Sequence, residues 1–265
     1  MDKNINIEWE AVDKCPVCGY KGIPSIDNMD REIGDIIHVY WCPRCLSSYH
    51  NPRMSQKSYL EYYETGFYRS HPSRYISPER NVAKRSAAEM KVFMIEGFRR
   101  DIQIDVNRVL DYGCGRGYLL AALNKKYNCE CIGYDLYHDP GAVVEIIDDK
   151  DKITGKFDLR ACCHVLEHLS NPMEELDWMV SKLNTNGFLF LELPFTRLVF
   201  PAHPIIFSRE SIFRVMRHIK ARYIFYDTQY LNDNGLIVAQ PNNVTDLSLP
   251  EYFTDAIAYL KEEPE

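Results

Sequence analysis

Apolar and polar positions along the chain follow two periods, one typical of helices and one typical of buried strands. Helical spacing of apolar residues predicts a helix over residues 78–100, with the stripe Ala83, Ala87, Met90, Phe93 or Met94, and Phe98. Short apolar runs predict strands at 109–111, 131–135, 143–147, 157–163 and 188–195. Further helices are expected at 119–123, at 173–183, and from Ser208 or Ser211 to Ile219. Strands that alternate with helices in this way indicate an α/β domain built on a parallel sheet.

The last part of the pattern predicts a closing antiparallel hairpin. Two strands are expected at 223–227 and 236–239, and the sequence Asn-Asp-Asn-Gly at 232–235 joins them. The Asn-Gly pair is a strong hairpin signal. A turn is expected at 184–187 before the strand at 188–195, and the acidic tail from Pro241 carries one expected helix at 251–260.

Cysteine spacing sets residues 1–52 apart from the rest of the chain. Four of the nine cysteines form two C-x-x-C pairs, Cys15 with Cys18 and Cys42 with Cys45, on either side of a strand expected at 36–41. Two such hairpins supply the four thiolates that tetrahedral Zn²⁺ prefers. About fifty residues build too small a core, so the metal is expected to supply much of the folding energy. The sequence therefore predicts a zinc ribbon.

The remaining cysteines and the histidines near the ribbon are expected to have other roles. Gly19 suits the left-handed position after the first cysteine pair, and Leu46 takes the equivalent place in the second, which makes that turn less typical. His38 and His50 are expected to pack or lie at the surface, because four cysteines already complete the ligand set. The other five cysteines are expected to be buried small hydrophobes.

The segment from Val109 to Tyr118 holds three glycines at alternate positions directly after an apolar run that ends in Asp111. This G-x-G-x-G spacing predicts a tight turn between a strand and a helix, where a ligand approaches the backbone. It is not the dinucleotide fingerprint G-x-G-x-x-G, because Tyr118 stands where the last glycine is required. The next strand ends in Asp135, and an acid at that place accepts hydrogen bonds from ribose hydroxyls.

The combination of Asp111, the glycine turn and Asp135 resembles the cofactor site of class I S-adenosylmethionine (SAM) methyltransferases. This resemblance implies a Rossmann-like seven-stranded sheet, here with a small N-terminal zinc ribbon. It also implies SAM as cofactor, in contact with Asp111, Tyr112, Gly113, Cys114, Gly115, Gly117, Asp135, Leu136, Asp148 and His164. Asp148 or Asp149 would meet the adenine amino group, and an exposed turn is an equal alternative.

The front of the chain narrows the resemblance. The series C-P-V-C-G, W-C-P-R-C, N-P-R and Y-Y-x-x-x-F-Y is similar to bacterial methyltransferases with an N-terminal zinc ribbon, many of which are associated with sugars, surface glycans and secondary metabolites. The expected division is a ribbon at 1–52, a linker with covering helices at 53–105, the SAM-binding domain at 106–242 and a tail at 243–265. The tyrosines after residue 58 either pack the ribbon onto that domain or line the acceptor pocket.

Three residues are candidates for catalysis. The segment H-V-L-E-H-L at 164–169 matches the motif after the fourth strand of the same family, which implies that His164 lies against the methionine end of the cofactor. Glu167 and His168 are expected on the first turn of a helix. Methylation of a hydroxyl needs a group that takes its proton, and histidine suits neutral pH. His203, between two prolines beyond the fifth strand, is the predicted base, with His164 and Glu167 as the alternatives.

Net charge and hydropathy bear on which partners the protein is expected to bind. A net charge of −7 argues against broad affinity for nucleic acid, and no apolar run approaches the length of a membrane span. A cytoplasmic location is expected. The predicted function is SAM-dependent methyl transfer to a small-molecule hydroxyl, on a sugar or a nucleotide-linked sugar. The alternatives are an RNA methyltransferase whose ribbon grips RNA, and a non-catalytic zinc-ribbon interaction protein.

Overall fold

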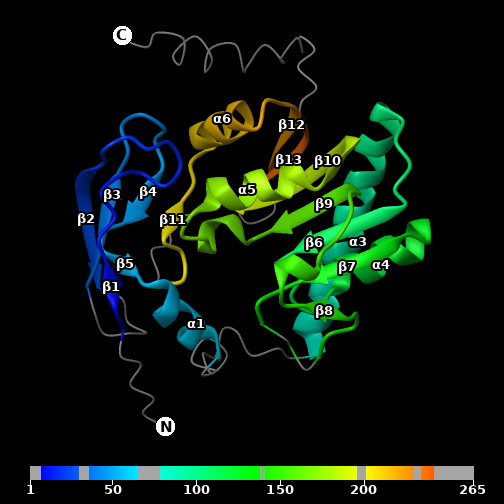
Figure 1. Cartoon of the computed structure of the whole chain (residues 1–265), viewed down its shortest axis with the longest axis horizontal. Coiled ribbons are helices and arrows are strands. Elements are labelled where there is room, and N and C mark those ends of the chain that lie inside the picture. Colours follow the sequence, from blue (N-terminus) through cyan, green and yellow to red (C-terminus); the bar gives the residue numbers. More distant parts are fainter. Residues whose placement is uncertain are drawn as a thin grey trace.

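The computed structural model describes residues 7–29, 36–64, 78–137, 139, 141–195, 201–228 and 234–241. A small N-terminal unit of short strands lies beside a larger α/β unit (Figure 1). The helix predicted at 251–260 lies outside the described residues. The first two residues of the turn predicted at 232–235 also lie outside them, whereas the strand predicted at 188–195 is described. Among the described helices, none combines the length and the apolar character needed to cross a membrane.

The larger unit is built on a seven-stranded sheet in the order β12-β13-β10-β9-β6-β7-β8. Five strands run parallel, from β8 to β10, and β13 lies antiparallel between β10 and β12. The strands are β6 (Arg108–Tyr112), β7 (Glu130–Tyr134), β8 (Ile146–Ile147), β9 (Phe157–Cys163), β10 (Leu183–Pro194), β12 (Ala221–Thr228) and β13 (Asn234–Pro241). This architecture confirms the predicted Rossmann-like sheet with its closing antiparallel pair.

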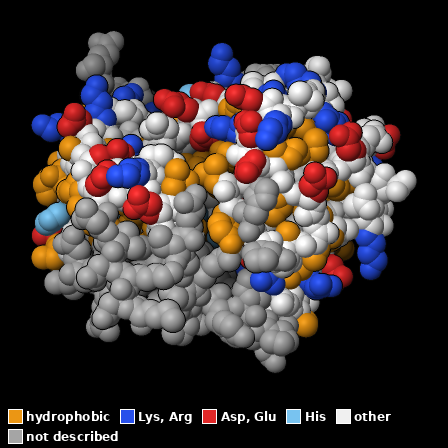
Figure 2. Space-filling model, turned by 60° about the horizontal axis from the view of Figure 1, so that its bottom comes forward, with side chains coloured by type: hydrophobic (Ala, Val, Ile, Leu, Met, Phe, Trp, Pro, Cys, Tyr) orange, Lys and Arg blue, Asp and Glu red, His pale blue; other side chains and the backbone are white. Residues whose placement is uncertain are grey.

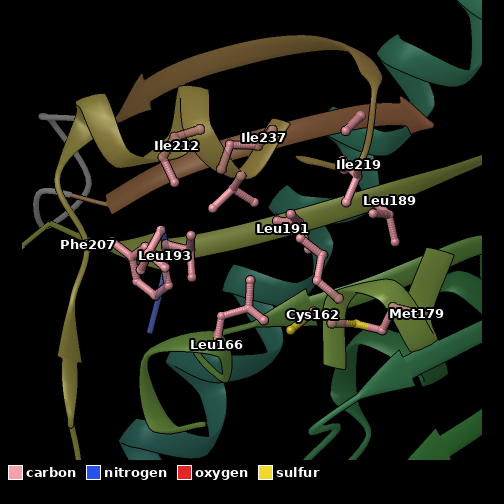
Figure 3. Close-up of a cluster of buried hydrophobic side chains, with 14 of the residues drawn as sticks. Cys162, Leu166, Met179, Leu189, Leu191, Leu193, Phe207, Ile212, Ile219 and Ile237 are labelled. Atoms are coloured by element: carbon pink, nitrogen blue, oxygen red, sulfur yellow. The ribbon is translucent and has the colours of Figure 1, made fainter. Parts of the chain in front are cut away.

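Both faces of this sheet are covered, as the side chains of β10 show. Phe188 and Phe190 belong to one core cluster with residues of α3 (Pro78–Ile102) and α4 (Tyr118–Tyr127). The alternate residues Leu189 and Leu191 belong to another, with residues of α5 (Pro172–Ser181) and α6 (Arg209–His218) (Figure 3). Successive side chains of a strand point to opposite faces, so helices on both sides explain the continuous apolar runs in the sequence.

The N-terminal ribbon, residues 9–54, shares its hydrophobic core and its main sheet with the larger unit. It holds β1 (Trp9–Glu10), β2 (Ile23–Met29), β3 (Ile36–Trp41), β4 (Ser48–His50) and β5 (Arg53–Met54), and α1 (Gln56–Glu64) follows. Its main sheet has the order β11-β4-β3-β2, and β11 (Ile205–Ile206) comes from the loop between β10 and α6. Tyr49 of the ribbon lies in the same core cluster as Leu191 of the large sheet.

The structure bears out several predicted elements and corrects others. The helix at 78–100 and the strand at 157–163 are confirmed, and Ser208 caps α6 while Ser211 bonds back to it. The predicted turn at 184–187 is wrong, because β10 already begins at Leu183 with an irregular register up to Phe188. Gly187 makes this possible, since a Cβ there would lie 2.8 Å from the Phe157 carbonyl oxygen.

The other two corrections concern the edge where ligands bind in open α/β sheets. The strand expected at 143–147 is reduced to β8, because Val144 packs against Gly117 instead of pairing in the sheet. Glu167 and His168 are predicted on the first turn of a helix. They lie instead in a separate 3₁₀ helix, η3 (Leu166–His168), since Pro172 starts α5 only at its own position.

Candidate functional site

Two cavities adjoin at the carboxyl edge of the parallel strands. The larger, about 640 Å³, lies between α3 and the turn after β6, and the smaller, about 190 Å³, extends toward α1 and η3. Gly113 and His164 line both cavities. Gly113 and His164 therefore mark the place where one bound molecule would pass from one cavity to the other.

The glycine turn has the conformation that its spacing predicts. Gly113, Gly115 and Gly117 all have positive φ, at 75°, 54° and 75°, a region that glycine enters at no steric cost. A Cβ at Gly113 would collide with Val165, and one at Gly117 would collide with Val144. A Cβ at Gly115 would meet nothing within 4 Å, because this residue faces the larger cavity. The turn thus exposes backbone to a ligand at its middle glycine.

Asp135 follows β7 and lines the smaller cavity beside Leu136. Its Oδ2 accepts a hydrogen bond from the Gly115 amide at 2.8 Å, and its Oδ1 accepts one from the Tyr137 amide at 3.0 Å. The carboxylate therefore joins the glycine turn to the next loop. Each carboxylate oxygen has a second lone pair, so both can also accept from hydroxyl groups of a ligand.

Asp111, near the end of β6, lines the larger cavity with only 4 % of its surface exposed. Its Oδ1 is buried and has no hydrogen-bond partner among the described residues. Burial raises the pKa of Asp111 to about 7, against the opposing effect of Lys91 and with a further rise from Asp135. A buried carboxylate with an unpaired oxygen at a cavity wall fits a ligand that carries a positively charged donor.

Lys91 is a site residue that the sequence reasoning missed. It lies on α3, lines the larger cavity, and its Nζ is 2.6 Å from Oε2 of Glu192 at the end of β10. A signal was present, because Lys91 is four residues after Ala87 and three before Met94 and so falls on the apolar stripe of its helix. A lysine on such a stripe indicates a buried charge with a partner.

His164 stands between two carboxylates at the junction of the cavities. Its Nδ1 is 3.6 Å from Glu167 Oε1, and its Nε2 is 3.6 Å from Glu192 Oε2. Burial opposes the charged imidazolium, but the two acids outweigh it and raise the pKa of His164 to about 9. Its φ of 56° turns the chain sharply between β9 and η3.

Of the other residues predicted to contact the cofactor, some line the two cavities and one does not. Cys114 lines the larger cavity, while Tyr112 lines the smaller one and donates its hydroxyl to Glu175 at 2.7 Å. Asp148 is exposed and is not among the described residues that line these two cavities. Asp149 beside it caps a 3₁₀ turn by accepting from the Asp151 amide.

His203 lies next to His168, with ring centroids 4.4 Å apart and ring planes at 78°. His168 lines the smaller cavity, together with Tyr59 and Tyr63 of α1. Tyr62 is fully buried in a small cluster between the ribbon and the loop at Ala202. Of the tyrosines after residue 58, two thus line a cavity and one packs, while Tyr68 lies outside the described residues.

The four ribbon cysteines converge. Cys15 and Cys45 have their sulfurs 3.5 Å apart, Cys18 and Cys42 have theirs 3.4 Å apart, and all four sulfurs lie within 4.8 Å of one another. Zinc bonds of about 2.3 Å in a tetrahedron separate sulfurs by about 3.8 Å. The donor set therefore fits one Zn²⁺.

The two turns that hold these cysteines have the same backbone. The Gly19 amide donates to Cys15, and the Leu46 amide donates to Cys42, at 2.8 and 2.9 Å. Leu46 has a φ of 60°, close to the 72° of Gly19, so the missing glycine did not alter the second turn. The buried Ser47 hydroxyl adds contacts to Cys45 and Cys15 sulfurs at 3.0 and 3.4 Å.

Comparisons with known proteins agree with this geometry. A family model described as a methyltransferase domain matches residues 79–233, which is more than half of the chain. The mitochondrial ubiquinone biosynthesis O-methyltransferase of Saccharomyces cerevisiae is 31% identical over 136 residues. That match spans 44% of this chain and 43% of the yeast protein, so the chain spans less than half the length of the relative.

Two solved structures are similar to this chain, and the first of them shares its fold. The 1,6-didemethyltoxoflavin-N1-methyltransferase of Burkholderia thailandensis, solved with S-adenosylhomocysteine, has a TM-score of 0.53 and 15% identity, over 82% of this chain and 98% of that chain. The magnesium protoporphyrin IX methyltransferase of Synechocystis PCC 6803, solved with SAM, has a TM-score of 0.48 and 16% identity, over 68% and 94% of the two chains.

The sheet order, the left-handed glycine turn and the family match over residues 79–233 all lead to one assignment. The chain belongs to the methyltransferase-domain family and shares its fold with a methyltransferase solved with S-adenosylhomocysteine.

Proposed function

We propose that this enzyme methylates a hydroxyl group of a small polar molecule, a sugar or a nucleotide-linked sugar. The observation that carries the proposal is the pair of cavities that meet at Gly113 and His164. One cavity has the charges that a zwitterionic amino acid needs, and the other has aromatic walls with a few polar groups. Such a division suits a cofactor and an acceptor that meet at one point.

The larger cavity suits the methionine part of SAM. Asp111 offers an unpaired buried oxygen to the ammonium group, and Lys91 offers a cation to the carboxylate. Asp135 suits the ribose hydroxyls on the other side of Gly113. When bound, SAM supplies an electrophilic methyl group; its transfer to the acceptor oxygen breaks the carbon–sulfur bond, leaves the electron pair on sulfur and releases the hydroxyl proton.

The acceptor is placed on the η3 side of the smaller cavity. Asp135 follows β7 and His168 follows β9, and β6 separates these strands, so the two residues lie toward opposite ends of the cavity. Tyr59 and Tyr63 provide aromatic faces against which the apolar face of a sugar ring packs. Hydroxyl and imidazole groups beside them fix the ring's polar edge.

The proton of the acceptor hydroxyl is assigned to His203, with Glu167 and His164 as the alternatives. His164 touches both cavities, so its place is against the cofactor and its two acids, where it shapes the pocket. His203 belongs to a loop fixed by the Tyr59 hydroxyl, which donates to the Ala202 carbonyl at 3.1 Å. His203 reaches the acceptor cavity through its contact with His168.

An aromatic hydroxyl is the second candidate acceptor. The yeast relative carries an O-methyltransferase name, and tyrosine walls stack on an aromatic ring as well as on a sugar. RNA has less support. On the face shown in Figure 2, acidic and basic side chains are interspersed and form no broad basic field of the kind that phosphate binding requires.

We propose further that the four ribbon cysteines hold one structural Zn²⁺. The sulfur spacing supports this, as do the matched backbone turns and the Ser47 hydroxyl that stabilises two of the thiolates. Four cysteine ligands complete a tetrahedral site and leave no open coordination position of the kind that catalytic zinc needs, and three of the four are buried.

The test is a product assay. The purified enzyme is incubated with SAM and a panel of sugars, nucleotide sugars and phenols, and mass spectrometry detects a gain of one methyl group. Methylated sugars support the proposal, and methylated phenols alone would shift it to the second candidate. Filter binding of total RNA at two salt concentrations tests the RNA alternative, because phosphate-driven binding weakens steeply with salt.

A further inference from the structure

We propose that Glu167, His168 and His203 form a second metal site, for a divalent transition-metal ion such as Zn²⁺, at the wall of the acceptor cavity. One ligand atom from each of the three side chains lies within 4.8 Å of the other two. Two imidazoles and one carboxylate are a common ligand set for catalytic zinc and related ions. This inference rests on the proposed function, which places the acceptor in that cavity, and it adds a metal ion beside the acceptor.

The hydrogen bonds of His168 prepare it for a metal. Its Nδ1 lies 2.6 Å from the Ala202 carbonyl oxygen, which can only accept, so Nδ1 carries the proton and donates it. The Tyr63 hydroxyl lies 3.1 Å from the same nitrogen. The other nitrogen, Nε2, then carries the lone pair and lies 3.8 Å from Glu167 Oε1. Metal-bound histidines characteristically donate their second ring nitrogen in this way, to a carbonyl or a carboxylate.

Glu167 provides the second, independent observation. The residue is 1 % exposed, and both of its carboxylate oxygens are buried without a hydrogen-bond partner among the described residues. His164 Nδ1 and His168 Nε2 lie 3.6 and 3.8 Å from Glu167 Oε1, both beyond hydrogen-bond distance. A buried carboxylate in this situation is costly unless it is paired or ligates a metal. A cation between Glu167 and the two histidines removes that cost.

The distances suit ion binding after a small adjustment. Tetrahedral bonds of about 2.1 Å separate ligand atoms by about 3.4 Å, so the ligand atoms of the cluster need to approach one another by at most about 1.4 Å. Three protein ligands leave a coordination position open, and His168 lines the acceptor cavity. An ion there lowers the pKa of a hydroxyl group that it contacts. With the ion bound, His203 acts as a ligand, and the released proton passes to solvent.

Metal counting tests the site without any knowledge of the acceptor. The full-length protein is treated with a mild chelator, reloaded with Zn²⁺ and analysed by mass spectrometry of its metal content. We expect two ions in each wild-type chain and one, on the cysteines, in Glu167→Gln and His203→Asn. The affinity for the second ion should fall by about 100-fold or more in these variants. His218→Asn is the matched control, because this histidine pairs with Asp177 on the exposed face of α6.

The outcomes separate the two proposals. Binding of S-adenosylhomocysteine, measured by calorimetry, shows that each variant is folded and does not depend on the second ion. The proposal of a second metal site is overturned if the wild type binds one zinc ion per chain, or if both variants bind two. If a methylated product forms with one zinc bound, the proposed function stands and the metal site falls. If two zincs bind and no sugar or phenol is methylated, the reverse holds.

Discussion

Asp111→Asn is the substitution that tests the cofactor site most directly. The change keeps the size and shape of the side chain and removes only its charge. Asp111 is 4 % exposed, and its unpaired Oδ1 faces the place proposed for the ammonium group of SAM. Burial first, and Asp135 in addition, raises the pKa of Asp111 from 3.8 to about 7, while Lys91 opposes the rise.

The raised pKa of Asp111 determines whether the folded protein gains or loses stability as the pH rises. A carboxyl group whose pKa is raised by folding contributes stability that is complete below its unfolded pKa and is lost as the pH rises through about 7. At 1.36 kcal/mol for each pH unit, an interval of about three pH units corresponds to about 4 kcal/mol. The ligand-free wild type should therefore lose stability relative to Asp111→Asn between about pH 4 and pH 7, by up to about this amount, and should show no further loss above pH 7.

Ligand binding should show the opposite preference. The ammonium group of S-adenosylhomocysteine needs the charged carboxylate, so wild-type affinity should rise with pH and level off above pH 7. Below pH 7 the Kd should increase about tenfold for each pH unit. Asp111→Asn should weaken binding at pH 8 by about 2–3 kcal/mol and abolish this pH dependence.

Calorimetry at pH 6, 7 and 8 measures the affinity, and thermal unfolding at pH values from 4 to 8 measures the stability. Asp105→Asn is the matched control, because it removes the same charge from a side chain that is 89% exposed. Wild-type affinity at pH 8 in the Asp111→Asn protein would refute the pairing with the ammonium group. A wild-type affinity that is equal at pH 6 and pH 8 would refute the raised pKa.

Four further predictions follow from the same geometry. Asp135→Ala should weaken S-adenosylhomocysteine binding by about 2–3 kcal/mol, and an unchanged affinity in calorimetry would exclude the ribose contact. Gly115→Val should be worse, because φ is 54° and the side chain would enter the larger cavity; tight binding by that variant would place the cofactor elsewhere. His203→Ala should lower turnover by about 10²–10⁴-fold with nearly unchanged S-adenosylhomocysteine affinity, and wild-type turnover would remove it from the mechanism. Cys42→Ser should abolish zinc binding at the ribbon and speed hydrogen exchange at 205–206 as well as in the ribbon; exchange confined to the ribbon would contradict the shared sheet.

The elements that the sequence predicts best are those whose burial is uniform. The strand at 157–163 was predicted with its observed bounds, because every second residue on each face meets a helix layer or another core side chain. The start of β10 was missed, since Asn184, Thr185 and Asn186 are exposed and polar and join the sheet through backbone contacts that only Gly187 reveals. Local polarity indicates a turn there, and tertiary pairing overrides it.

The candidate site divides in the same way. The glycine turn and Asp135 were predictable because they are close in sequence and each needs one backbone geometry. The approach of His203 to Glu167 and His168 was not, because it depends on how the loop after β10 returns across the sheet edge. Leu46 shows the limit of residue preference, since it adopts the left-handed conformation that glycine favours when its amide is needed by Cys42.

The loop between β10 and α6, which carries His203, connects the ribbon to the candidate site. The loop that carries His203 is fixed from three sides: β11 pairs with β4, the His50 amide donates to the Pro204 carbonyl at 3.0 Å, and the Tyr59 hydroxyl donates to Ala202. The first two contacts come from the sheet that the cysteine cluster closes. A metal at those cysteines therefore lies outside both cavities and still determines where His203 stands. Because β11 has only two residues, it depends on the ribbon for its pairing, and the ribbon depends on β11 and the shared core for a cover.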